Sequence, residues 1–193
     1  MHIRLAHPTR SDRTEAPTVG AEAADVPIFK SVTDRSYRMD ADDAGIYARD
    51  SEYLDRSIQL GVASSKVLRV TFPQSADADA GTDHPLLDRV DDYLTGVEEA
   101  DFSDVQVALT MPTDQRKVLE SVRDVPYGES VTVAAIARMT PSLNDDDEED
   151  LTLVRTALAE NPAPLVIPDH RVSDGPSAAP PAVEQRLRSI EGL

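Results

Sequence analysis

The 193-residue chain contains no cysteine and no tryptophan, and aromatic residues make up only 4% of it. The absence of cysteine excludes disulfide bonds, thiolate metal sites and a thiol nucleophile. No segment is apolar over the length that a membrane span needs, and the N-terminus does not combine a charged segment with an apolar one as a secretory signal does. We therefore expect a cytoplasmic protein that does not contact a membrane, and we expect neither a metal nor another cofactor.

Lysine is also scarce, since the chain has only Lys30, Lys66 and Lys117. The sequence holds 36 Asp and Glu against 19 Lys and Arg, which gives a net charge of -17. Many carboxylates with few lysines and aromatics predict a surface that stays hydrated in concentrated salt, as in a halophilic, archaeal cytoplasm. A partly disordered acidic protein is the alternative, although the C-terminal half shows clear apolar periodicity. The charge disfavours nucleic acid as a partner, but concentrated salt weakens that argument.

The first half of the chain divides into two predicted regions. Residues 1–50 lack periodicity and are rich in Pro, Thr, Ala and acidic residues, so we predict a disordered acidic N-terminal extension. Residues 51–111 are predicted to form a small α/β subdomain. Its predicted elements are a strand-like stretch at the end of Tyr53–Ala63, a turn marked by Gly61, Ser64 and Ser65, and a strand over Lys66–Phe72, which together predict a hairpin. A helix over His84–Leu94 and a third strand over Val105–Thr110 follow.

The remaining residues, 112–193, show apolar residues at helical spacing in four segments. The predicted helices follow Pro112, follow Thr132 as an N-cap, extend from Leu151 to Leu158, and extend from Ala182 to Ile190. An acidic run, Asn144–Asp150, separates the second helix from the third. Two short helices joined by a turn are typical of a helix-turn-helix, but most such arrangements in small domains serve only packing.

The most informative segment is Asn161–Val172. A short apolar run between prolines, Leu165–Ile167, leads directly into three ionisable residues, Asp169, His170 and Arg171. Taken alone, such a triplet indicates a strand end that enters a solvated turn, because isolated motif matches are weak.

The order of motifs in the second half resembles the methylated-DNA–protein-cysteine methyltransferases, which are the O6-alkylguanine-DNA alkyltransferases and their alkyltransferase-like relatives. The resemblance covers residues 51–193 and is specific from residue 113 onward. It implies an α+β fold in which a small N-terminal sheet and helix precede a helical, winged helix-turn-helix-like domain. The matching motifs are Pro126-Tyr127-Gly128-Glu129, Val131-Thr132, Ile136-Ala137, Val154 to Leu158, Asn161-Pro162 with Ile167-Pro168, His170-Arg171-Val172, and Glu191-Gly192.

The resemblance also implies roles for individual residues. In that family the helix-turn-helix docks in the DNA minor groove, and the damaged guanine is flipped into a pocket beside a Pro-Cys-His-Arg segment. The cysteine thiolate takes the alkyl group, a histidine activates it through a water, and a glutamate orients the histidine. An asparagine holds the preceding turn and contributes to the hydrogen-bond network. By position, Asn161, His170 and Glu191 match this set, Arg171 matches as a polar member of the motif, and Asp169 stands at the acceptor position.

Several departures from the family pattern bear on function. Asp169 is not a thiol, and a carboxylate is a much weaker nucleophile, so thioether formation is excluded. Val133 stands where the family has a tyrosine that rotates the nucleotide, and Thr152 where it has an intercalating arginine, for which Arg155 is a candidate replacement. The loop that lines the substrate pocket is replaced by the shorter segment 173–181. The candidate DNA-binding residues are Thr132, Val133, Thr152, Arg155 and Arg171.

Three functions remain open from the sequence. The first is an alkyltransferase-like protein that binds double-stranded DNA as a monomer, recognises damage and hands it to other repair proteins. The second is a degenerate fold for protein interaction or regulation without a DNA site, in which the acidic run is an interaction surface or a solvated loop. The third is a carboxylate nucleophile at Asp169, with His170 as base and Glu191 as orienting group. A salt bridge between Asp169 and Arg171 is the favoured alternative to that site.

Overall fold

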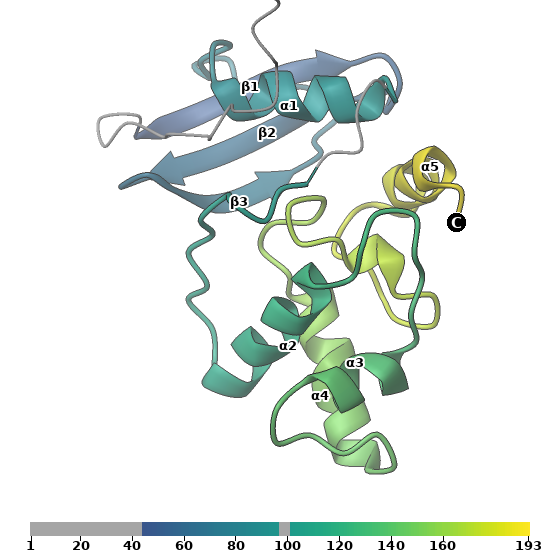
Figure 1. Ribbon diagram of the computed structural model, residues 1–193. Helices are drawn as coiled ribbons and strands as arrows, with labels where there is room; N and C mark the ends of the chain where they lie inside the picture. The colour runs from purple at the N-terminus through teal and green to yellow at the C-terminus, as the bar shows by residue number, and fades with distance from the viewer. Residues whose placement is uncertain (1–43, 97–100) are drawn as a thin grey trace, which may run out of the picture. The chain divides into compact units, whose positions relative to one another are not determined.

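The computed structural model describes residues 44–96 and 101–193, which form an antiparallel sheet followed by helices (Figure 1). This arrangement confirms the predicted α+β class. The elements are β1 (Gly45–Ser51), β2 (Arg56–Ala63), β3 (Lys66–Thr71), α1 (Pro85–Leu94), α2 (Thr113–Arg123), α3 (Val133–Met139), α4 (Glu148–Ala159), the 3-10 helix η1 (Asp169–Arg171) and α5 (Pro181–Glu191). Within the described residues, none of the helices has the length and apolarity that a membrane span requires.

The sheet has the order β1-β2-β3, and each neighbouring pair is antiparallel. The predicted hairpin is confirmed, but Gly61 is not part of its turn, because it lies within β2 and pairs with both neighbouring strands. Ser64 and Ser65 join β2 to β3, and both have positive φ angles, 52° and 59°. Such angles match the twist of the flanking strands in a tight hairpin turn. Alternate residues of β2, Ile58 and Leu60, are fully buried and share a hydrophobic core with α1.

Two predictions about the sheet are wrong. Residues 45–50 belong to the predicted disordered extension 1–50, but with Ser51 they form β1, which pairs with β2 along its whole length. Val105–Thr110 does not form a strand; it contributes an isolated bridge between Val67 and Val107, with Val67 N donating to the Gln106 carbonyl at 2.8 Å. Its apolar residues are divided between two cores, since Val105 belongs to the core of the sheet, Leu109 packs against the core of the helices, and Val107 contacts both. The rest of the predicted extension, residues 1–43, lies outside the described residues.

Helices α2, α3 and α4 pack together around a second hydrophobic core. The predicted N-cap of α3 is present, since the Thr132 hydroxyl accepts a hydrogen bond from Ala135 N at 3.2 Å. Helix α4 begins earlier than predicted, because Asp147 caps it by accepting from Glu149 N at 2.8 Å. The acidic run Asn144–Asp150 therefore supplies the first turn of α4, where carboxylates stabilise a helix through its dipole.

The apolar run Leu165–Ile167 joins the two cores. Leu165 and Val166 belong to the core of the sheet, whereas Ile167 belongs to the core of the helices. Leu165 has a φ of 82°, a conformation that is unfavourable for a leucine and that turns the chain between the cores. The sheet core also includes Leu187 of α5, so it draws on both predicted segments, 51–111 and 112–193, and the boundary between them stays a prediction.

Candidate functional site

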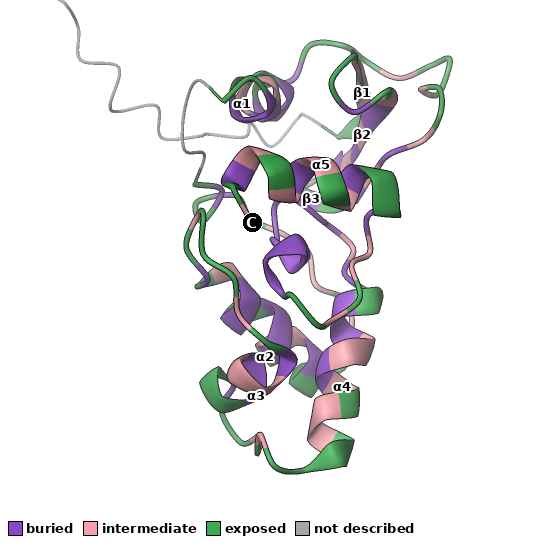
Figure 2. Ribbon diagram, turned by 90° about the vertical axis from the view of Figure 1, so that its right-hand side faces the viewer, coloured by how far each residue is buried: buried purple, intermediate pink, exposed green. Residues whose placement is uncertain are grey.

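The three ionisable residues that the sequence singles out form the single turn of η1, and all of them are buried (Figure 2). Their exposed fractions are 1% for Asp169, 1% for His170 and 8% for Arg171. The turn is closed by the Val172 N–H, which donates to the Asp169 carbonyl at 3.0 Å. The interpretation as a solvated turn is therefore wrong, and each buried charged group needs partners inside the protein.

Glu191, the last residue of α5, provides the partners for two of them. Its side chain is 0% exposed. His170 Nε2 lies 2.9 Å from Glu191 Oε1, and Arg171 binds both carboxylate oxygens, with Nε at 2.8 Å and Nη2 at 2.9 Å. The Tyr93 hydroxyl of α1 donates to Oε1 at 2.7 Å, and Gly128 N donates to Oε2 at 3.3 Å. One carboxylate thus holds α1, the turn before α3, η1 and α5 together.

These contacts determine the ionisation of Glu191 and the tautomer of His170. Burial alone would raise the pKa of Glu191, but hydrogen bonds from His170 and Arg171 outweigh it and lower the pKa to about 2. Because Nε2 of His170 faces a carboxylate, we assign the ring proton to that nitrogen. The other ring nitrogen, Nδ1, has no hydrogen-bond partner among the described residues.

The Arg171 guanidinium group makes its contacts inside the protein. Its third nitrogen, Nη1, donates to the Val125 carbonyl at 2.7 Å, and its guanidinium carbon lies 5.9 Å from the centroid of the Tyr127 ring. The Arg171 carbonyl also accepts from Val131 N at 2.9 Å. The predicted salt bridge between Asp169 and Arg171 is wrong, because Arg171 pairs with Glu191. All three nitrogens of the guanidinium group are thus engaged within the protein, although the resemblance makes Arg171 a candidate for DNA contact.

Asp169 is held by a separate set of donors. Its Oδ2 accepts from Asn161 Nδ2 at 2.8 Å and from Ala178 N at 3.1 Å, and its Oδ1 accepts from the Ser177 hydroxyl at 2.7 Å. Burial raises the pKa of Asp169, and these three hydrogen bonds oppose the shift. Asn161 also donates to the Ile167 carbonyl at 2.9 Å and accepts from Ala163 N at 3.0 Å. Asn161 therefore holds the turn before η1, which is the role that the resemblance implies.

The candidate DNA-binding residues on α3 and α4 differ in accessibility. Thr132 and Thr152 are exposed, and the side chain of Arg155 is 43% exposed. Arg155 Nη1 lies 3.6 Å from Glu148 Oε1, one of the acidic residues in the first turn of α4. Val133 is only 1% exposed and packs in the helical core, so the structure does not place its side chain to touch DNA.

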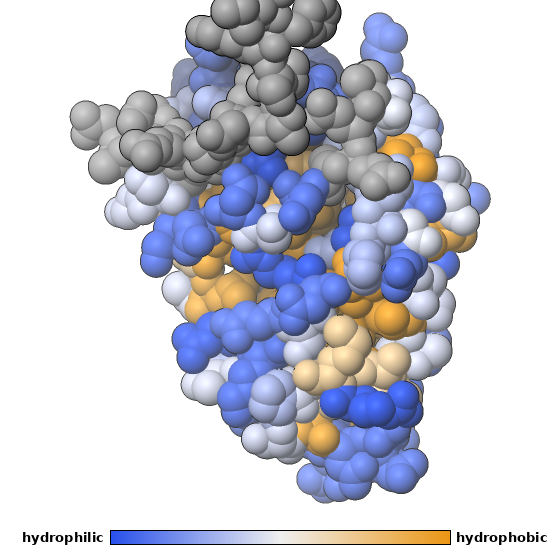
Figure 3. Space-filling view, in the orientation of Figure 1, coloured by the Kyte–Doolittle hydropathy of each residue, from blue (hydrophilic) through white to orange (hydrophobic). Residues whose placement is uncertain are grey.

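The connection between α3 and α4 ends in three aspartates, Asp145, Asp146 and Asp147, and α4 begins with three further acidic residues. Asp145 accepts two hydrogen bonds from the Arg138 guanidinium of α3, at 3.0 and 2.5 Å. Asp147, Glu148 and Asp150 lie at the N-terminal end of α4. In Figure 3 this end of the helical half is hydrophilic. The helices that the resemblance directs towards DNA therefore carry acidic residues close to the candidate arginine.

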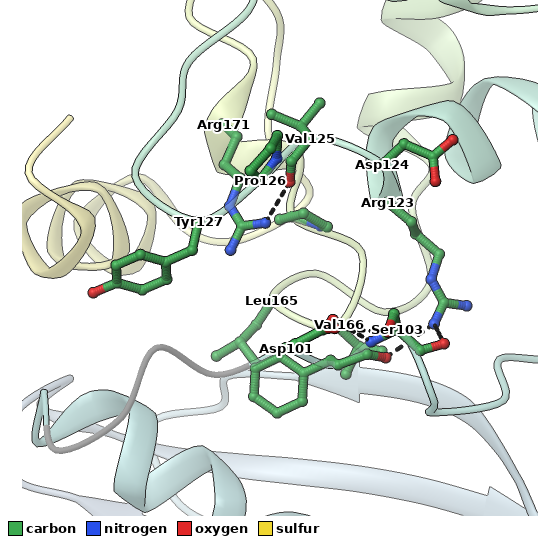
Figure 4. A pocket seen from close by; sticks show the side chains of 12 residues that line it. Asp101, Ser103, Arg123, Asp124, Val125, Pro126, Tyr127, Leu165, Val166 and Arg171 are labelled. Carbon is green, nitrogen blue, oxygen red and sulfur yellow. Dashed lines mark hydrogen bonds between the residues drawn. The ribbon is translucent and has the colours of Figure 1, made fainter.

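A cavity of about 340 Å³ lies beside η1, between the turn that follows α2 and the apolar run (Figure 4). Its lining includes Phe102, Arg123, Tyr127, Leu165 and Arg171 but not Asp169. Nη2 of Arg123 already donates to the carbonyls of Phe102, Ser103 and Val105, each at 2.9 Å. Because Asp169 does not line this cavity, the cavity is separate from the acceptor position. No cluster of three or more His, Asp or Glu side chains within the described residues could hold a metal ion.

Sequence reasoning missed three of the residues that build the site. From the sequence, Tyr93 is recognisable only as one of the residues on the apolar face of α1. The residues near it in sequence do not indicate that its hydroxyl bonds to a residue of α5. Ser177 and Ala178 lie in the segment 173–181, which has no residue pattern that predicts its path. Their contact with Asp169 spans eight and nine positions and depends on the fold alone.

Three comparisons place this geometry among known proteins. The profile of the family described as "6-O-methylguanine DNA methyltransferase, DNA binding domain" matches residues 113–181. The methylated-DNA–protein-cysteine methyltransferase of Methanopyrus kandleri is 32% identical over 130 residues, which are 65% of this chain and 93% of that protein. The crystal structure of the Mycobacterium tuberculosis O6-methylguanine methyltransferase has a TM-score of 0.58 at 20% identity, over 77% of this chain and 92% of that one. The structure of M. tuberculosis OGT in complex with DNA has a TM-score of 0.57 at 21% identity, over 77% and 91%.

Replacing Glu191 with glutamine should destabilise the protein strongly. The change leaves the buried Arg171 guanidinium without a counter-charge, which typically costs about 3–5 kcal/mol. Denaturant unfolding measures the loss. The matched control is Tyr93→Phe, which removes one neutral donor to the same carboxylate and should cost about 1 kcal/mol. Similar, small losses for both variants would contradict a central role for the Glu191 ion pair.

The same carboxylate predicts a pH dependence. The pKa of Glu191 is lowered from its ordinary value of 4.5 to about 2 in the folded protein, so its ionised form stabilises the fold above pH 4.5. That stabilisation is lost as the pH falls from 4.5 towards 2. The difference in unfolding free energy between wild type and Glu191→Gln should therefore be constant above pH 4.5 and shrink below it. Denaturant titrations across this range measure the difference, and a difference that grows in acid would refute the assignment.

Proposed function

Because the chain belongs to the methylated-DNA–protein-cysteine methyltransferase family and contains no cysteine, we propose that it is an alkyltransferase-like protein that binds double-stranded DNA. We propose a role in damage recognition, in which the protein acts as a monomer and passes the damaged site to other repair proteins. The relatives are named for transfer to a protein cysteine, and this chain has no residue that could take the group in that way.

The observation that carries the proposal is the extent of the family match in the helical half. The profile of the family's DNA-binding domain extends from α2 through α3, α4 and η1 to the start of α5, and a structural relative was crystallised with DNA. Thr132, Thr152 and Arg155 lie on or beside α3 and α4 with accessible side chains, so we propose them as the residues that contact DNA. Val133 and Arg171 are buried and are left out of this interface.

We propose a structural role, and not a catalytic one, for Asp169 at the acceptor position. Both oxygens of Asp169 accept hydrogen bonds, and Nε2 of His170 faces Glu191 and not Asp169. The three hydrogen bonds to its oxygens weaken the Asp169 carboxylate as a nucleophile, and the neighbouring His170 ring makes its hydrogen bond to Glu191. We therefore propose that Asn161, His170 and Glu191 position the segment around η1 without a chemical step.

The second candidate function is a protein-interaction or regulatory module without a DNA site. It is favoured by one observation, the acidic residues at the N-terminal end of α4, where Glu148 lies beside Arg155. Carboxylates at this end repel phosphates, and the net charge of the chain is -17. Under this alternative the acidic end of α4 would meet a basic surface of a partner protein.

We also propose that the protein works in the salt-rich cytoplasm of a halophilic archaeon. The composition supports this, because 36 acidic residues face 19 basic ones and only three of the latter are lysines. In concentrated salt the repulsion among surface carboxylates, and between them and DNA phosphates, is screened within a few ångströms. Such conditions remove the main physical objection to DNA as a partner.

DNA binding is tested with a duplex that carries O6-methylguanine, in molar KCl, with fluorescence anisotropy as the readout. Wild type should bind. Arg155→Ala should weaken binding by about fivefold to tenfold, because it removes the hydrogen bonds that the guanidinium would donate to a phosphate. Glu148→Gln should strengthen binding, because it removes the carboxylate that lies next to Arg155.

The control for this test is Arg69→Ala, which makes the same change of charge at an exposed position of β3. Its affinity for the duplex should equal that of wild type. If wild type binds no duplex at any salt concentration, the DNA-binding proposal fails and the protein-interaction module is favoured.

Adaptation to salt predicts that stability rises with KCl. Screening of the net charge of -17 reduces self-repulsion in the folded state, so the free energy of unfolding at neutral pH should increase from dilute buffer to molar KCl. Near the sequence pI of about 4.4, where the net charge is close to zero, the dependence should be much weaker. Stability at neutral pH that is flat or falls with KCl would count against a halophilic protein.

A further inference from the structure

We infer that the Asp169 carboxylate closes the acceptor position from inside the protein, and that DNA is bound without a nucleobase entering that position. The inference deepens the proposed function and rests on it for its second half. The first half, closure by Asp169, concerns this chain alone and can be tested without DNA.

The Asp169 carboxylate accepts hydrogen bonds from three donors. Its two oxygens accept from Ser177 Oγ at 2.7 Å, Ala178 N at 3.1 Å and Asn161 Nδ2 at 2.8 Å. The Ser177 hydroxyl in turn accepts from Ala179 N at 3.1 Å, so its proton is directed at Asp169. A side-chain carboxylate therefore takes the donors that Ser177 and Ala178 present at this point, and Asp169 is left 1% exposed.

The segment 173–180 is fixed at both sides of this contact. On one side, the Asp174 carboxylate accepts from Val133 N, at the start of α3, at 2.6 Å. Gly175 follows in a position without room for a side chain, since a Cβ there would lie 2.7 Å from Leu158 Cδ1. On the other side, Ala179 is buried in the core of the sheet. So short a segment cannot move away from Asp169 unless one of these anchors is released.

The chemical type of residue 169 decides whether this closure forms. An ionised carboxylate offers two oxygens and about four lone-pair directions, whereas a thiol is a weak acceptor with one atom. Three donors converge on Asp169, and only a side chain with two strong acceptor atoms satisfies all of them. A nucleobase edge would have to compete for these donors with an acceptor that is part of the chain and already in place, which favours the internal one.

Amide hydrogen exchange of the full chain tests closure. The Ala178 amide should be protected in wild type, exchange much faster in Asp169→Ala, and exchange at an intermediate rate in Ser177→Ala, which keeps the buried carboxylate and its other two donors. The control is Ser173→Ala, since the exposed Ser173 hydroxyl donates to the Val131 carbonyl at 3.2 Å and does not touch Asp169. An unprotected Ala178 amide in wild type, or equal protection in all variants, would overturn the inference.

Fluorescence of a duplex with a central 2-aminopurine tests the consequence for DNA, because this base brightens when it leaves the stack. Binding is followed by anisotropy in molar KCl. Wild type and Ser173→Ala should bind without a change of fluorescence, and Asp169→Ala should bind with a several-fold increase. A rise with wild type, or none with Asp169→Ala, would overturn the inference. If no variant binds, the proposed function has failed, and the exchange measurement still decides whether Asp169 closes the site.

Discussion

The buried carboxylate of Glu191 is the contact on which the arrangement of the second half depends. It accepts hydrogen bonds from α1, from the turn before α3 and from η1, and it belongs to α5. Its location is unfavourable in itself, because the C-terminal end of a helix repels negative charge and burial removes water. The left-handed Gly192, with a φ of 73°, ends α5 directly after it and fixes its place. Only the Arg171 guanidinium and the other donors outweigh these two costs, which explains why so many donors converge there.

This contact also explains why an aspartate can occupy the acceptor position. Arg171 and His170 are both engaged by Glu191, so Asp169 has neither as a hydrogen-bond donor although it is their neighbour in sequence. Successive residues of a 3-10 turn point in different directions, and residues 169 and 171 enter two separate networks. The buried carboxylate of Asp169 is tolerated because Asn161, Ser177 and Ala178 donate hydrogen bonds to it. A change of residue type at position 169 therefore leaves the Glu191 network intact.

Residue patterns within short segments predicted part of the fold correctly. They did not predict contacts between residues that lie far apart in the sequence. The hairpin around Ser64 and Ser65 and the cap of α3 at Thr132 follow from turn and capping chemistry within a few residues. Strand β1 was missed because its exposed and buried residues do not alternate clearly and acidic residues precede it. At the site, the resemblance singled out Asn161, His170 and Glu191, which all take part in the hydrogen bonds around η1, and their functional roles stay a prediction. Sequence reasoning assigned Arg171 to the wrong carboxylate, because Glu191 lies 20 positions away and only the fold brings it near.

The charge of the protein limits how such a fold could recognise DNA. In concentrated salt, the release of counterions contributes little to affinity, so the loss of basic residues from a DNA-binding surface is tolerated there. Affinity must then come from hydrogen bonds and from the shape of the duplex, and the exposed residues Thr132 and Thr152 are polar positions that could contribute to it. Recognition of shape needs no base in the protein interior. An acceptor position filled by Asp169 and an acidic surface are thus compatible with each other. Both favour a protein that recognises damaged DNA by the shape of the duplex, without moving a base out of the stack.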